Sequence, residues 1–301
     1  MTAKLHGLVA ATHTPFDAEG RLALDVVEKQ AEHLARAGAS AVFIGGSTGE
    51  SHSLTVAERL ALAERWVAVA KGSPLRVVVH VGSNCLEDSK TLAEQAQRLG
   101  AAAISALSPS YFKPPSLDVL VECCRAIAGA APGLPFYFYD IPSMTGVQLP
   151  MPDFLVRAEG RIPTLAGIKF TNPDLMAYQL CLRSHEGRFD IPWGTDESLL
   201  AALAVGAQGG VGSSYNFAAP LYLRVIEAFR AGDLDAAREW QFRSVRLIRL
   251  LAGFGYMAAA KATMGLLGVP VGPPRLPNAG LGPGRHEELR GALERLGFFD
   301  W

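Results

Sequence analysis

Short apolar runs alternate along the chain with longer segments in which apolar residues recur every three or four positions. The short runs end in Gly, Ser, Thr or Asn and are typical of buried strands, whereas the longer segments have the period of amphipathic helices. Eight runs are expected to be strands, over residues 7–11, 41–44, 77–81, 103–107, 136–139, 166–170, 191–193 and 210–213. This regular alternation predicts an α/β fold with parallel strands.

Each expected strand is followed by an expected helix. The helices are expected to begin near Asp25, Val56, Glu87, Leu117, Pro152, Pro173, Glu197 and Ala219. Thr55 and Glu58 have the spacing of a capping box at the second of them. Eight strand–helix units are the arrangement of a (β/α)8 TIM barrel, which predicts catalytic residues where the strands end. A Rossmann-like sheet is the alternative, but no Gly-x-Gly-x-x-Gly follows the first strand.

Three more helical segments follow the expected barrel, starting near Asp233, Gly255 and His286. The chain has 301 residues and 49% hydrophobic content, enough for one large core or two ordinary domains. No segment resembles a linker, and the densest stretch of Pro and Gly, residues 269–283, lies near the C-terminus. We therefore expect residues 1–301 to form a single domain, with the barrel over about 7–230 and additional C-terminal helices over about 231–301.

Charge and cysteine content exclude several classes of partner. The formal net charge is −1, and the densest basic stretch (Arg243, Arg246 and Arg249) has the spacing of one helix face, so nucleic acid is not an expected partner. The four cysteines form no Cys-x-x-Cys pair, which favours a reducing compartment. No signal peptide is evident, and no apolar segment approaches the ~18 residues of a membrane helix. We expect a soluble cytoplasmic protein that does not bind membranes.

The most informative stretch is residues 165–171, an apolar run whose only charge is Lys169. It reads as a buried strand that enters a helix, with Asn172 as the cap and Pro173 as the first helical residue. Burial lowers the pKa of a lysine by as much as ~3–5 units, and a neutral amine is a nucleophile towards carbonyls. Lys169 is therefore a candidate Schiff-base lysine. A lysine that extends to solvent or pairs with a carboxylate is the structural alternative.

Other strand ends carry candidate polar groups. Residues 45–50 form a loop with three glycines, Ser47 and Thr48, which can expose backbone N–H groups to a carboxylate. One of Tyr137 and Tyr139 is expected to point inwards and to relay protons to a lysine adduct on the next strand. Asp196 and Glu197 can accept hydrogen bonds from a polyol or cap the next helix. The seven histidines are scattered without His-x-His or His-Glu-x-x-His, so no metal site is expected.

Five motifs in order resemble the pyruvate-dependent lyases and aldolases of the N-acetylneuraminate lyase and dihydrodipicolinate synthase superfamily. The resemblance covers roughly residues 7–268. The motifs are Thr14-Pro15-Phe16, Gly45-Gly46-Ser47-Thr48-Gly49-Glu50, Tyr139-Asp140-Ile141-Pro142, Gly167-Ile168-Lys169 and Gly212-Ser213-Ser214-Tyr215-Asn216. The resemblance implies a class I aldolase that needs no cofactor, because Lys169 itself forms the Schiff base with a 2-oxo acid.

The resemblance also implies roles for further residues. Tyr139 would be the proton shuttle, Ser47 and Thr48 would hold the substrate carboxylate, and Tyr111 would complete a hydroxyl relay with Ser47 and Tyr139. In this superfamily such a tyrosine often belongs to a loop at a subunit interface, so a homotetramer is implied.

Within the superfamily the chain looks most like the N-acetylneuraminate lyases, which cleave sialic acid reversibly to pyruvate and N-acetylmannosamine. The residues that match their polyol-binding set are Thr171, Gly194, Asp196, Glu197 and Ser213. Dihydrodipicolinate synthases carry an arginine for a second carboxylate where this chain has Met144, which cannot form that bidentate contact. A 2-keto-3-deoxy sugar acid aldolase, a hydro-lyase of the same superfamily and a non-catalytic 2-oxo acid binding barrel are the alternatives.

One residue departs from the pattern of the bacterial relatives. Asp140 follows Tyr139 where those relatives usually have asparagine. A negative charge beside Tyr139 is expected to raise the pKa of the phenol and to change the pH optimum.

Overall fold

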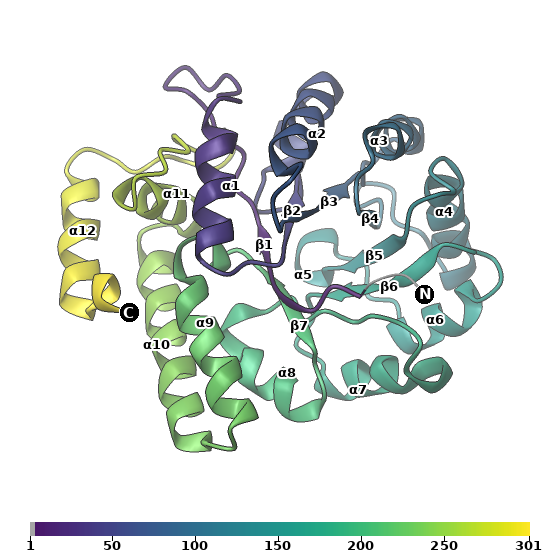
Figure 1. The fold of residues 1–301 in the computed structure, drawn as a ribbon. Coiled ribbons are helices and arrows are strands. Elements are labelled where there is room, and N and C mark those ends of the chain that lie inside the picture. Colours follow the sequence, from purple (N-terminus) through teal and green to yellow (C-terminus); the bar gives the residue numbers. More distant parts are fainter. Residues whose placement is uncertain (1–3) are drawn as a thin grey trace.

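A computed structural model describes residues 4–301, and its centre is one sheet of seven parallel strands. The strands are β1 (Gly7–Ala11), β2 (Ala41–Ile44), β3 (Arg76–His80), β4 (Ala103–Leu107), β5 (Phe136–Asp140), β6 (Leu165–Phe170) and β7 (Gly209–Gly212). Their spatial order is β6-β5-β4-β3-β2-β1-β7. Neighbouring strands are thus consecutive in sequence except for β1 and β7, which lie side by side. Figure 1 shows helices arranged around the outside of these strands.

The helices follow the strands as the sequence predicts. They are α1 (Val26–Arg36), α2 (Val56–Ala70), α3 (Leu86–Leu99), α4 (Leu117–Gly129), α5 (Pro142–Thr145), α6 (Met151–Ala158), α7 (Leu175–Arg183), α8 (Leu199–Val205), α9 (Tyr215–Arg230), α10 (Leu234–Gly253), α11 (Tyr256–Leu266) and α12 (Arg285–Leu296). Short 3-10 turns lie at η1 (Ser51–Ser53), η2 (Ser184–Gly187), η3 (Asp196–Ser198) and η4 (Phe298–Asp300). The capping box of Thr55 and Glu58 is present at α2 and is confirmed.

The predicted strand over residues 191–193 closes the barrel without forming a regular ladder. It makes only isolated bridges, from Trp193 to Phe170 of β6 on one side and to Gly210 of β7 on the other. Pro192 has no N–H to contribute, although its carbonyl accepts a hydrogen bond from Phe170. Gly167 allows the close approach of this segment to β6, since a Cβ there would overlap the Asp190 carbonyl. The TIM barrel is confirmed, and the segment at its eighth strand position is joined to its neighbours by isolated bridges.

Side chains alternate between the barrel interior and the layer between strands and helices. The interior cluster includes Val9, Phe43, Tyr137 and Tyr139. Phe136 and the residue two positions after it belong to the other cluster, which packs against the helices. Residues two apart in a strand share one face, so both tyrosines point inwards. The expectation that only one of them does so was wrong.

Helix α9 begins four residues before the predicted start at Ala219. Pro220 therefore lies inside the helix, where it has no N–H to donate, and Ala218 has the non-helical angles φ −136° and ψ 24°. The Asn216 carbonyl, which a residue at position 220 would ordinarily bond, instead lies 2.8 Å from His33 Nε2 of α1. The proline thus bends the helix without ending it.

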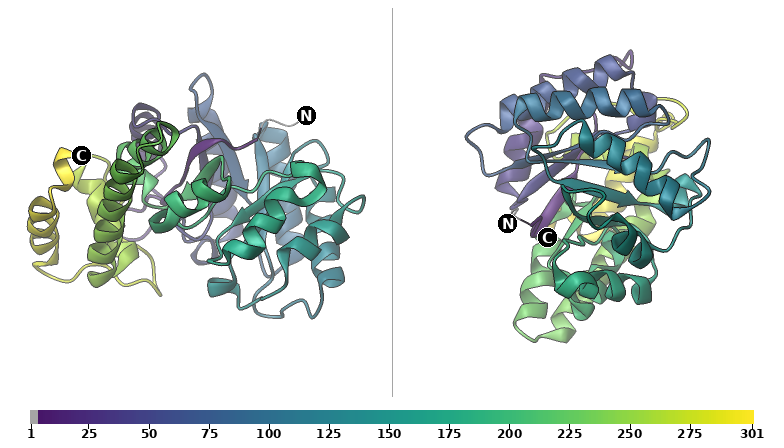
Figure 2. Two further views of the ribbon diagram at one scale, coloured as in Figure 1. Left: turned by 90° about the horizontal axis from the view of Figure 1, so that it is seen from below. Right: turned by 90° about the vertical axis from the view of Figure 1, so that its right-hand side faces the viewer.

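Helices α10, α11 and α12 follow the barrel and lie together on one side of it (Figure 1). The left view of Figure 2 shows the same arrangement, with the C-terminus on that side of the barrel. The chain between α11 and α12 returns to the barrel, where the Phe16 amide donates to the Val271 carbonyl at 3.1 Å. The boundary between barrel and extension near residue 230 stays a prediction.

Candidate active site

Lys169 is the penultimate residue of β6 and points into the barrel near the ends of the strands. Only 4% of it is exposed to solvent. Its Nζ lies 3.9 Å from the ring centres of both Phe43 and Tyr139. The structural alternatives for this lysine do not fit, since it neither extends to solvent nor forms an ion pair among residues 4–301.

Tyr139 occupies the position directly opposite Lys169 in the register of β5 against β6. Its hydroxyl donates a hydrogen bond to Ser47 Oγ at 3.4 Å, which links it to the loop after β2. Burial raises the pKa of Tyr139 to about 12, although the neighbouring hydroxyls of Ser47 and Thr171 favour the phenolate. The phenol is therefore protonated at neutral pH, next to the amine.

The surroundings of Lys169 favour its neutral form. Burial lowers its pKa from 10.5 to about 7, and the negative charge of Asp196 opposes part of that shift. Burial also raises the pKa of Asp196 to about 6, against hydrogen bonds from Ser214 that favour the carboxylate. Desolvation of both groups thus outweighs their mutual attraction. Near pH 7 a large fraction of Lys169 is a free amine.

Imine formation should follow the titration of Lys169. Because the neutral amine is the nucleophile, the rate of trapping pyruvate with cyanoborohydride should rise about tenfold per pH unit below pH 6 and level off above pH 8. Initial trapping rates measured by intact mass from pH 5 to 10 give the midpoint. The negative charge of Asp196 stabilises the ammonium form of Lys169. Asp196→Asn removes this charge and should therefore lower the pH of the midpoint. A midpoint near 10.5 in the unaltered protein would contradict the assignment.

The glycine-rich loop lies between β2 and α2, at the same end of the barrel as Lys169. Ser47 and Thr48 are half-buried there, and the Ser47 carbonyl accepts the Glu50 amide at 3.0 Å. Gly45 has a φ of +64°, and a Cβ at Gly49 would lie only 3.1 Å from the Gly45 backbone. The loop is thus a tight turn that only glycines permit at these positions. It brings Ser47 to Tyr139, as the resemblance implies.

The residues expected to bind the polyol converge from three segments. Thr171 follows β6, and the backbone of Gly194 packs so closely on it that a Cβ there would overlap the threonine hydroxyl. Asp196 is buried and accepts hydrogen bonds from the amide and hydroxyl of Ser214, while Glu197 beside it is exposed. Ser214 occupies Oδ2 of Asp196, so only Oδ1 is left to accept a hydrogen bond from a substrate hydroxyl.

Tyr256 is a member of this group that sequence reasoning missed. Its hydroxyl lies 2.7 Å from Ser213 Oγ, although it belongs to the first turn of α11 in the C-terminal extension. Burial raises the pKa of Tyr256, so it stays a phenol. No local pattern identifies it, because a tyrosine at a helix start is unremarkable until the fold brings it to the end of β7.

Tyr111 does not join the other hydroxyls within the described chain. It lies on the loop after β4, is 78% exposed, and its ring packs edge-on against Phe112, which is 84% exposed. Its backbone amide donates to Asn84 Oδ1 at 3.0 Å, which anchors the loop. Residues 4–301 of one chain thus bring Ser47 and Tyr139 together and leave Tyr111 projecting outwards.

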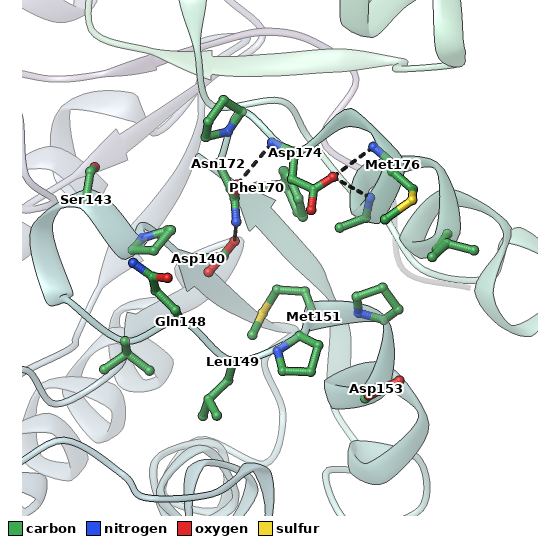
Figure 3. Close-up of a pocket in the computed structure, with 17 residues that line it drawn as sticks. Asp140, Ser143, Gln148, Leu149, Met151, Asp153, Phe170, Asn172, Asp174 and Met176 are labelled. Carbon is green, nitrogen blue, oxygen red and sulfur yellow. Dashed lines mark hydrogen bonds between the residues drawn. The ribbon is translucent and has the colours of Figure 1, made fainter.

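Asp140 lies on the opposite side of β5 from Tyr139. Its carboxylate accepts a hydrogen bond from Asn172 at 3.2 Å and faces a cavity of about 650 Å³ between α5, α6 and α7 (Figure 3). Burial raises the pKa of Asp140 to about 6. The charge of Asp140 is not among the causes of the raised pKa of Tyr139, so the expected effect on the phenol was wrong.

The same region corrects the expected start of α7. Asn172 pairs with Asp140 and does not cap the helix, which begins at Leu175. Asp174 is the cap, and its carboxylate accepts the amides of Met176 and Ala177. Pro173 therefore lies before the cap.

Two properties of residues 4–301 bear on other chemistry. Over that range no group of three or more His, Cys, Asp or Glu side chains could hold a metal ion. None of the helices described is both long enough and apolar enough to cross a membrane.

Comparisons with known proteins identify the family of this chain. Residues 4–296 match the model of the dihydrodipicolinate synthetase family. The N-acetylneuraminate lyase of Rattus norvegicus is 40% identical over 91% of this chain and 87% of its own length. The structure of the Proteus mirabilis N-acetylneuraminate lyase superposes with a TM-score of 0.96 at 40% identity, covering 98% of this chain and 100% of that chain. The N-acetylneuraminate lyase (sialic acid aldolase) of Aliivibrio salmonicida also gives 0.96, at 43% identity and 98% coverage of both chains. This chain belongs to the dihydrodipicolinate synthetase family.

Proposed function

We propose that this protein cleaves N-acetylneuraminate reversibly to pyruvate and N-acetylmannosamine through a Schiff base on Lys169. The observation that carries the proposal is the buried amine of Lys169, with its pKa lowered to about 7 and Tyr139 directly opposite. The choice of sugar rests on the relatives named N-acetylneuraminate lyase, which match along almost the whole chain. The reaction makes the protein a carbon–carbon lyase of the class I aldolase type.

The reaction begins when the Lys169 amine attacks C2 of the open-chain sugar and water is lost. The protonated imine then accepts the electron pair of the C3–C4 bond as that bond breaks. The C4 hydroxyl loses its proton at the same time, which yields the aldehyde N-acetylmannosamine and a pyruvate enamine. Protonation of the enamine at C3 and hydrolysis of the imine release pyruvate and restore the amine.

Tyr139 is proposed to relay the C4 proton. With a pKa of about 12 its phenol is protonated, so it takes this proton while passing its own to the substrate carboxylate. Ser47 accepts the hydrogen bond of the phenol and, with Thr48, would hold the carboxylate. The reacting carboxylate is thereby placed beside the relay.

The polyol end of the sugar would extend towards β7. Thr171, Gly194, Asp196, Glu197 and Ser213 are proposed to bind its hydroxyls. The buried Asp196 can accept at its open oxygen, and Ser213 is oriented by Tyr256. Specificity for a polyol over a second carboxylate follows from position 144, where an exposed methionine supplies no cation.

The active assembly is proposed to be a cytoplasmic homotetramer. Support for association comes from Tyr111 and Phe112, two adjacent rings that are both largely exposed at a loop tip. Contact with another subunit would cover these rings and let Tyr111 complete the hydroxyl relay with Ser47 and Tyr139.

Reductive trapping tests the proposed reaction. The protein is incubated with N-acetylneuraminate or with pyruvate, borohydride is added, and intact and peptide masses are read. The expected result is the same pyruvyl adduct on Lys169 in both arms, because cleavage leaves a pyruvate enamine. An adduct from pyruvate alone would contradict sialic acid as the substrate, and no adduct in either arm would contradict imine chemistry.

A further inference from the structure

A fully buried ion pair lies behind the glycine-rich loop. Lys261 Nζ of α11 is 3.0 Å from Glu50 Oε1, and neither side chain is exposed to solvent. The same ammonium donates to the Thr14 carbonyl at 2.9 Å and lies 4.4 Å from the centre of the Phe16 ring. The lysine thus holds the end of the loop and the segment after β1 at once.

The carboxylate of Glu50 is bound by the C-terminal part of the chain. Its second oxygen, Oε2, accepts the Arg275 amide at 2.8 Å and the Asn278 side-chain amide at 3.4 Å. The partners of both carboxylate oxygens therefore come from α11 and the chain that follows it. The backbone of Glu50 is left-handed, with φ of 57°, a conformation that a residue with a side chain rarely adopts without support.

The pair is connected to the loop through short hydrogen bonds. The Glu50 amide donates to the Ser47 carbonyl at 3.0 Å, which fixes the turn that carries Ser47. The Thr14 hydroxyl donates to the Gly49 carbonyl at 2.6 Å, while Lys261 holds the Thr14 carbonyl. Any shift of the Lys261 ammonium would be transmitted to the loop by both routes.

Stability alone does not explain such a pair. Removing two charges from water is costly, and apolar replacements of a buried pair are often as stable or more so. A paired, hydrogen-bonded charge does fix the position and orientation of the groups that it bonds. Here the pair holds Glu50, at the end of the loop between β2 and α2, and the Thr14 carbonyl in the segment after β1.

We propose that Lys261 and Glu50 are positioning residues through which the C-terminal extension sets the geometry of the loop that holds the substrate carboxylate. This inference rests on the proposed function, in which Ser47 and Thr48 bind that carboxylate. The extension would then influence the affinity for 2-oxo acids through Lys261 and Glu50, although neither side chain touches the substrate.

The test compares pyruvate with acetone, a ketone of similar size without a carboxylate. Lys261→Met removes the charge and keeps the length of the side chain. The concentration of pyruvate that half-saturates borohydride trapping should rise about 10-fold to 10²-fold, the cost of a small misplacement. Trapping of acetone on Lys169 should stay within about threefold, because no carboxylate contact is involved. Lys261→Arg should restore most of the pyruvate affinity.

Two further variants separate positioning from folding. Glu50→Gln combined with Lys261→Met leaves no unpaired buried charge, and it should fold while still binding pyruvate weakly. Glu58→Gln is the matched control, because it breaks the ion pair of Glu58 with the Arg275 side chain and leaves Glu50 intact. Its pyruvate trapping should match that of the unaltered protein.

The outcomes distinguish this inference from the function on which it rests. Failure of the unaltered protein to trap pyruvate, or equal half-saturation by pyruvate and acetone, would overturn the carboxylate site itself. Normal trapping in the unaltered protein with unchanged pyruvate half-saturation in Lys261→Met would overturn the positioning role alone. Equal losses for pyruvate and acetone, in step with a lower Tm, would also overturn it, because they would indicate a purely structural pair.

Discussion

Lys169→Ala should abolish both imine formation and turnover. The substitution removes the only amine that lies among the inward-facing groups of β5 and β6, so no covalent intermediate can form. Neither N-acetylneuraminate nor pyruvate should leave a borohydride-stable adduct, and pyruvate release should fall to the background rate. Intact mass and a coupled assay for pyruvate measure the two effects.

Lys169→Met is the control for the loss of side-chain volume. Methionine fills the space between the rings of Phe43 and Tyr139 without an amine, and it also removes the cost of a buried ammonium. Its Tm should equal or exceed that of the unaltered protein while it stays inactive. Substantial turnover in either variant would place the nucleophile elsewhere.

Tyr139→Phe should lower kcat on the order of 10²–10⁴-fold, the usual contribution of a group that transfers a proton. The ring remains, so its edge-on packing against Phe43 and His80 is preserved, and only the hydrogen bond to Ser47 is lost. Steady-state cleavage of N-acetylneuraminate measures the loss. Trapping of pyruvate on Lys169 should change far less, because the relayed proton belongs to bond cleavage.

The matched control for this variant is Tyr137→Phe. Tyr137 lies two residues earlier on the same face of β5, and its hydroxyl donates to Asp190 at 2.9 Å, away from Lys169. Turnover should be nearly unchanged, although stability should fall by about 1 kcal/mol for the lost buried hydrogen bond. Equal rates in Tyr139→Phe and the unaltered protein would assign the proton relay to another group.

The order of strands and helices could be predicted because each element carries its own pattern of apolar residues. The barrel then follows from short connections and right-handed crossovers. Local features that depend on a proline, which lacks a backbone N–H donor, could not be predicted from the sequence with equal accuracy. Pro192 reduces a strand to single bridges, and Pro220 bends a helix that had been expected to begin beside it.

The site was predictable where its residues end a strand. Lys169 and Tyr139 could be identified from their residue types and their positions at the ends of predicted strands. The structure places them directly opposite one another. Tyr256 and Lys261 could not be predicted in this way, because they reach the site from helix α11, and only the packing of α11 against the barrel brings them there. Assigning Asp140 an effect on Tyr139 neglected the alternation of side chains along β5.

That alternation has a consequence for how the protein can change over evolution. The interior face of β5 and β6 carries Tyr139 and Lys169, whereas Asp140 and Asn172 face the cavity between α5, α6 and α7. One strand pair therefore presents two surfaces that share no side chains. Substitutions that reshape the outer cavity can accumulate without altering the chemistry inside, but a single inserted or deleted residue in either strand would exchange the two surfaces and end catalysis.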